Sequence, residues 1–116
     1  MVLITIILND APYGSERIYN GLRTAMALQK RENVQINVFL LADSTFCALK
    51  GQLTPDGYYN IGRMITSISR KGSVGACGTC LDARGLSHLE ILDGVHRSTM
   101  NELTDWILSS DKILTF

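Results

Sequence analysis

The amino-acid sequence predicts an α/β fold: a three-layer α/β/α domain with a mainly parallel central sheet of about five strands. Two observations lead to this prediction. Short apolar runs rich in β-branched residues alternate along the chain with longer segments whose apolar residues recur at helical spacing. Alternation of this kind favours parallel strands with helices on both faces of the sheet. No repeat, linker or low-complexity segment interrupts the pattern, so residues 1–116 are expected to form a single domain.

The first half of the chain contains the clearest elements. Residues 2–8 form a continuous apolar, β-branched run, which is typical of a strand covered on both faces. Pro12 and Gly14 mark a turn, and apolar residues spaced three and four apart predict a helix over about 16–31. A second apolar, β-branched run predicts the next strand over about 34–41.

The second half continues the alternation, with one segment that is hard to interpret. We expect a short helix over about 43–51, a helix over about 58–70, a strand over 73–76, a short helix and a brief strand near Val95 within 84–97, a helix over about 98–109, and a strand over 111–116. The two longer helices carry apolar residues on one face, and Gly72 ends the first of them.

Composition excludes several classes of function. Eleven basic residues balance eleven acidic ones with no basic stripe, so nucleic-acid binding is not expected. The apolar residues 1–8 are too few to cross a bilayer and lack the features of a signal peptide, so we expect a cytoplasmic protein without membrane association. Tyr58 and Tyr59 are expected to be packing or interface residues.

The most informative feature is the pair Cys77 and Cys80, which follows the strand expected at 73–76. Catalytic groups of parallel sheets collect at the carboxyl ends of strands. If a helix starts after Cys77, its free N–H groups should lower the pKa of this thiol, and Arg84 should add positive charge. We therefore predict that Cys77, Cys80 and Arg84 form a site of sulfur chemistry. Cys47, the third cysteine, is expected to be buried.

The cysteine pair has three other interpretations. Two inert thiols on a tight turn would need no chemistry. A zinc site needs four ligands, and His88 and His96 do not have the usual spacing of zinc-binding histidines, so no metal is expected. Thioredoxin-like exchange matches the motif locally, but that fold places a cis-proline beside its active site, and Pro12 and Pro55 both precede the cysteines.

Three segments together resemble the DsrE/DsrF/TusD-like sulfur-relay family, with the small YchN-like branch most similar. They are 11–16 after the first strand, 76–85 around the cysteines, and 110–116. The resemblance implies the family's α/β/α domain (a DsrEFH-like fold) and assembly into hexamers. No cofactor is expected. The resemblance also implies that Cys77, eight residues before Gly85, carries sulfur as a persulfide. Cys80 is additional relative to the tRNA-thiolation carrier, which leaves dithiol–disulfide exchange open.

The functional hypothesis is a cytoplasmic sulfur carrier or sulfurtransferase-like protein that accepts and passes on persulfide sulfur through Cys77. The alternatives are a thiol–disulfide redox protein that uses Cys77 and Cys80, and a hexameric interaction protein without catalytic activity. A homo-oligomer is the expected partner arrangement, and the resemblance implies a hexamer, of identical chains or of related ones. The sequence does not identify the donor and acceptor proteins of a relay.

Overall fold

A five-stranded, fully parallel sheet forms the centre of the computed structural model, which describes residues 1–116. The strands are β1 (Val2–Leu8), β2 (Val34–Leu40), β3 (Ser73–Cys77), β4 (Val95–Ser98) and β5 (Lys112–Thr115). Their order across the sheet is β4-β3-β2-β1-β5, and every neighbouring pair is parallel. The predicted fold class is therefore confirmed.

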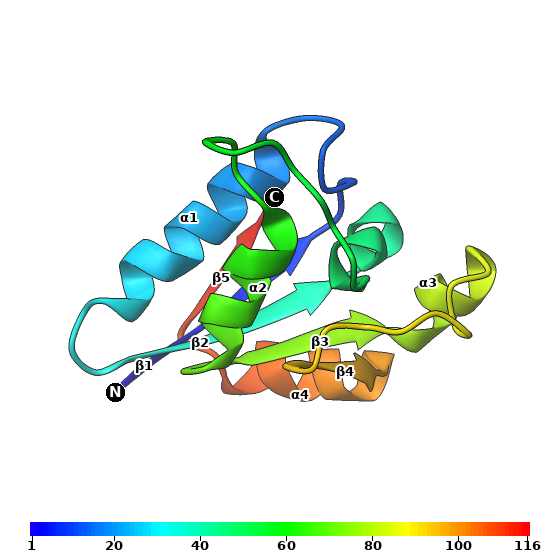
Figure 1. Ribbon diagram of the computed structural model, residues 1–116. Coiled ribbons are helices and arrows are strands. Elements are labelled where there is room, and N and C mark those ends of the chain that lie inside the picture. The colour runs from blue at the N-terminus through cyan, green and yellow to red at the C-terminus, as the bar shows by residue number, and fades with distance from the viewer.

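Helices cover both faces of the sheet, as Figure 1 shows. They are α1 (Arg17–Gln29), α2 (Ile61–Ser69), α3 (Gly78–Ala83) and α4 (Met100–Ser109), with a 3₁₀ helix, η1 (Ala42–Ala48), after β2. α1 and α2 lie side by side on one face, whereas α4 lies on the other. The short α3 continues directly from β3 at the carboxyl edge of the sheet.

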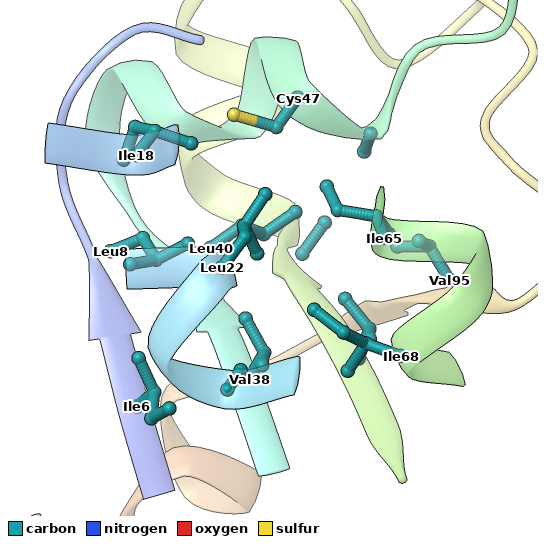
Figure 2. Close-up of a cluster of buried hydrophobic side chains, with 14 of the residues drawn as sticks. Ile6, Leu8, Ile18, Leu22, Val38, Leu40, Cys47, Ile65, Ile68 and Val95 are labelled. Atoms are coloured by element: carbon teal, nitrogen blue, oxygen red, sulfur yellow. The ribbon is translucent and has the colours of Figure 1, made fainter. Parts of the chain in front are cut away.

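The larger hydrophobic core lies between the sheet and the helices α1 and α2. Alternate residues of β1 and β2, such as Ile6 and Val38, point into it and are fully buried. Figure 2 shows their side chains meeting those of Leu22 and Ile65, with Cys47 at the same cluster. Cys47 is fully buried, as the sequence predicted.

The opposite face of the sheet carries a smaller buried cluster, which consists of Phe39, Cys77 and Leu103. Trp106 of α4 packs at its border, with its ring edge-on to Phe39 at a centroid distance of 5.8 Å. Cys77 therefore belongs to the face that α4 covers. Cys77 and Cys80 therefore belong to the cluster under α4, whereas Cys47 belongs to the larger core on the other face of the sheet.

Several element boundaries differ from the sequence-based expectations. Helix α2 begins at Ile61 and not near residue 58, because the Asn60 side chain caps it by accepting a hydrogen bond from the amide of Arg63 at 3.0 Å. No helix forms within 84–94. That segment consists of turns and one bridge between Leu49 and Ile91, while the helix lies earlier, at α3. The strand near Val95 is confirmed as β4.

Strand β5 pairs with β1 and forms one edge of the sheet. The carboxylate of Asp111 accepts a hydrogen bond from the amide of Leu3 at 2.9 Å, so the first and last strands are joined at their beginnings as well as along their length. None of the helices combines the length and the apolar character needed to traverse a lipid bilayer.

Candidate functional site

Cys77 is the last residue of β3 and the N-cap residue of α3. Its Sγ accepts a hydrogen bond from the amide of Cys80 at 3.4 Å. Only 5% of the residue is exposed, because Phe39 and Leu103 pack against it. The thiol thus lies almost entirely out of contact with solvent, at the carboxyl edge of the sheet.

The pKa of Cys77 is raised, which corrects the expectation that the start of the helix would lower it. Burial is the largest cause, and hydrogen bonding and charge interaction with the Cys80 side chain raise the pKa further. Hydrogen bonds from the amides of Cys80 and Thr79 act in the opposite direction but do not outweigh burial. In the isolated chain at neutral pH, Cys77 is therefore held mainly as the thiol.

Cys80 lies on the first turn of α3 and is more exposed than Cys77. Its Sγ accepts a hydrogen bond from the amide of Ala42 at 3.3 Å. Ala42 follows the carboxyl end of β2 and has a φ of 51°, in the left-handed region that residues with a side chain rarely adopt. This strained turn aims a backbone donor at a sulfur atom, so β2 and β3 both contribute to the site.

We expected Arg84 to add positive charge beside the Cys77 thiol, but its side chain bonds to other groups. Its Nε donates to the carboxylate of Asp43 at 2.9 Å, and its Nη1 donates to the carbonyl oxygen of Cys80 at 3.2 Å. The polar contacts of this guanidinium are therefore with η1 and with the backbone of α3, not with the Cys77 sulfur. In the single chain, Arg84 holds α3 in place beside the end of β2.

Arg97 of β4 is the cation beside Cys77, and the sequence analysis missed it. Its guanidinium packs over Gly78, where an added Cβ would lie 2.8 Å from the guanidinium carbon. It donates to Asp82 at 2.8 Å, and the pKa of Arg97 is raised first by that carboxylate and, to a smaller extent, by the charge of Cys77. The strand expected near Val95 was the signal that could have revealed Arg97. If that strand pairs with β3, residues 97 and 98 lie opposite Ala76 and Cys77.

A second polar group lies on the same face as Cys77. Glu102 of α4 bonds to the ring of His96 and accepts a hydrogen bond from the hydroxyl of Ser98, the residue opposite Cys77 in the β3–β4 register. Burial alone would raise the pKa of Glu102, but the bonds from Ser98 and His96 outweigh it and lower the pKa. The ring of His96 is thus tied to Glu102.

Similarity to known proteins covers the whole chain. Residues 3–116 match the model of the DsrE/DsrF-like family. Protein YchN of Escherichia coli is 44% identical over all of both chains, and an uncharacterised protein of Methanopyrus kandleri is 40% identical over 98% of this chain and 93% of its own.

Solved structures agree with the sequence comparison. The crystal structure of the E. coli YchN protein superposes with a TM-score of 0.91 over all of both chains. A protein of unknown function from Methanobacterium thermoautotrophicum shares the fold at a TM-score of 0.79 and 14% identity over all of both chains. The chain therefore belongs to the DsrE/DsrF-like family.

Proposed function

We propose that this protein is a sulfur carrier that accepts and passes on persulfide sulfur through Cys77. The observation that supports this most directly is the position of Cys77. The thiol ends a central parallel strand, accepts a backbone hydrogen bond from Cys80, and lies beside the Arg97 guanidinium. Membership of the DsrE/DsrF-like family supports the same chemistry, because the resemblance to its relay members implies a sulfur-carrying cysteine at the position of Cys77.

Loading of sulfur requires the thiolate of Cys77. The thiolate attacks the outer sulfur of a donor persulfide, R–S–SH, and forms Cys77–S–SH. The donor sulfur–sulfur bond breaks, and the donor leaves as R–S⁻ with the bonding electron pair. A nucleophilic sulfur of the acceptor then attacks the outer sulfur of Cys77–S–SH, and Cys77 leaves as a thiolate.

The residues around Cys77 fit this cycle. The amides of Thr79 and Cys80 stabilise the anionic sulfur, and Arg97 supplies a nearby positive charge. Arg84 positions α3 through Asp43 and the Cys80 carbonyl. Because burial raises the pKa of Cys77, we expect loading to become faster as the pH rises.

The direct test is to treat the protein with a small-molecule persulfide and to weigh it intact. We expect a mass increase of one sulfur atom in the wild type and in Cys80→Ser, and none in Cys77→Ser. Cys47→Ser is the matched control, because Cys47 is fully buried and should not be loaded. Failure of both the wild type and Cys80→Ser to take up sulfur would contradict the proposal.

Thiol–disulfide exchange is a second candidate, supported by the placement of the two free cysteines on one turn, where the amide of Cys80 donates to Sγ of Cys77 at 3.4 Å. In this scheme the Cys77 thiolate attacks a substrate disulfide, R–S–S–R, and one R–S⁻ leaves. The Cys80 thiolate then attacks Sγ of Cys77 in the mixed disulfide, the second R–S⁻ leaves, and a Cys77–Cys80 disulfide forms that a thiol reductant must open. Titration against glutathione buffers distinguishes the two candidates. A reversible disulfide in protein that takes up no sulfur favours the redox function.

A cytoplasmic homohexamer is part of the proposal, as the family resemblance implies. Exposed apolar side chains on and beside α4 provide surface for subunit contacts: Met100, Ile107, Leu108 and Ile113. Light scattering coupled to gel filtration measures the assembly. A monomer at micromolar concentration would contradict it.

A further inference from the structure

A groove between α1 and α2 lies on the face of the sheet opposite Cys77 and has no role in the sulfur chemistry proposed above. Its volume is about 770 Å³. Sites for small organic ligands span roughly 300–1,000 Å³, so the groove has the size of a binding site. It also combines charged and aromatic side chains.

One wall of the groove is held in place by stacked aromatic rings. Tyr59 stacks on Tyr19 at a centroid distance of 4.2 Å and on Tyr13 at 5.9 Å, while the Arg23 guanidinium lies 5.3 Å from the Tyr19 ring centre. The hydroxyl of Tyr13 donates to Gln52 at 2.7 Å and accepts from the amide of Ile61 at 3.1 Å. These bonds fix the wall before any ligand arrives.

The charges around the groove all have one sign. Arg23, Lys30 and Arg63 line it, and no aspartate or glutamate does. None of the three forms an ion pair with a carboxylate elsewhere in the chain. Because the whole chain carries equal numbers of acidic and basic residues, this groove concentrates positive potential that the rest of the surface balances.

Tyr58 is the aromatic residue of the groove that has no partner ring. It is 72% exposed, whereas Tyr19 and Tyr59 are stacked on each other. In the single chain the Tyr58 ring stacks on no other aromatic side chain. A rigid phenol ring beside cations offers a flat surface on which a planar group of a ligand can stack.

We propose that this groove binds a small planar anion, that is, an aromatic heterocycle that carries a phosphate group, as in a nucleoside monophosphate. The heterocycle stacks on Tyr58, and Arg63, with Arg23 and Lys30, binds the phosphate. Arginine suits this role because its planar fork donates two parallel hydrogen bonds to phosphate oxygens. Binding here involves no cysteine, so it is independent of the sulfur-carrier proposal.

The test uses the full chain and adenosine 5′-monophosphate as the probe, with calorimetric titration at low salt. We expect saturable binding, with adenosine and inorganic phosphate each at least about tenfold weaker, because each keeps only one half of the recognition. Arg63→Gln should weaken binding of adenosine 5′-monophosphate about tenfold or more, and Tyr58→Leu should weaken the same probe but leave inorganic phosphate unchanged.

Arg31→Gln is the matched control, because Arg31 is an exposed arginine just beyond α1 that does not line the groove. This variant removes the same charge and should retain wild-type affinity. The proposal is overturned by the absence of saturable binding, by equal losses in Arg31→Gln and Arg63→Gln, or by inorganic phosphate binding as tightly as the nucleotide. All replaced side chains are exposed, and equal thermal unfolding curves verify folding.

Discussion

The guanidinium of Arg97 lies directly over Gly78, the residue that follows Cys77. Only glycine leaves room for it, since a Cβ at position 78 would come within 2.8 Å of the guanidinium carbon and of Nε. The contact therefore links a residue of β4 to the first residue of α3. It also explains how a positive charge reaches the neighbourhood of Cys77 across the edge of the sheet.

Gly78→Ala should displace Arg97 and leave the fold largely intact, because the crowded atoms belong to the end of a flexible side chain. Loss of the nearby charge should raise the pKa of Cys77 further above its ordinary value. The pH dependence of alkylation at Cys77, followed by mass spectrometry in Cys47→Ala/Cys80→Ser protein, measures this shift. An unchanged profile would show that Arg97 does not act on the sulfur.

Arg97→Gln and Arg84→Gln should have different effects. Arg97→Gln should raise the apparent pKa of Cys77 in the alkylation assay, as Gly78→Ala does. Arg84→Gln should leave that pKa in place and reduce the free energy of unfolding by about 1 kcal/mol, because it removes the bonds from Arg84 to Asp43 and to Cys80. If Arg84→Gln shifted the alkylation profile as much as Arg97→Gln, the assignment of the nearby cation would be wrong.

Cys47 should make stability fall at alkaline pH. Burial raises its pKa to about 12, so the folded state keeps a proton that the unfolded state loses near its ordinary value. The unfolded state therefore binds fewer protons above about pH 9, and the free energy of unfolding decreases as pH rises toward 12. The contribution of Cys47 is fully present at neutral pH.

Urea unfolding of the wild type and Cys47→Ala at pH 7.5 and pH 10 tests this. The substitution should cost about 1 kcal/mol at neutral pH through the small cavity that it leaves. By pH 10 the wild type should have lost about 1–2 kcal/mol more than the variant. Parallel pH dependences in the two proteins would contradict a protonated, buried Cys47.

Ala42→Gly should stabilise the protein. The left-handed conformation of Ala42, with φ at 51°, costs roughly 1–2 kcal/mol for a residue with a Cβ, and glycine avoids this cost at the expense of roughly 0.5–1 kcal/mol of chain entropy. A gain of about 0.5–1 kcal/mol in the free energy of unfolding is expected. Asn33→Gly is the control, because Asn33 has a φ of 61° but asparagine tolerates this region better, so its gain should be smaller.

Sequence patterns predicted the fold well where the signal is local. The β-branched runs at 2–8 and 34–41 indicate strands because both faces of these strands are buried. The alternation of strands and helices along the chain then predicts a parallel sheet. The boundaries of α2 were harder to place, since Asn60 acts as a cap through contacts that apolar spacing does not reveal. The irregular 84–94 segment has turns, including Gly85 with a φ of 68°, and no periodic pattern.

The candidate site was predictable in position but not in electrostatics. The motif and its place after a strand locate Cys77 and Cys80 correctly at the carboxyl edge of the sheet. Their environment depends on residues far away in the sequence: Phe39 and Leu103 bury Cys77, and Arg97 supplies the cation. A pKa set by tertiary burial cannot be read from neighbours along the chain.

The pairing of β1 with β5 has a consequence for protein synthesis. Of the five strands, β1 is made first, and its partner on one side, which begins at Lys112, is made last. Until then, one edge of β1 has unpaired backbone groups between apolar side chains, a surface that promotes aggregation. Nascent chains that end before residue 112 should therefore depend on chaperones more than the finished sheet does.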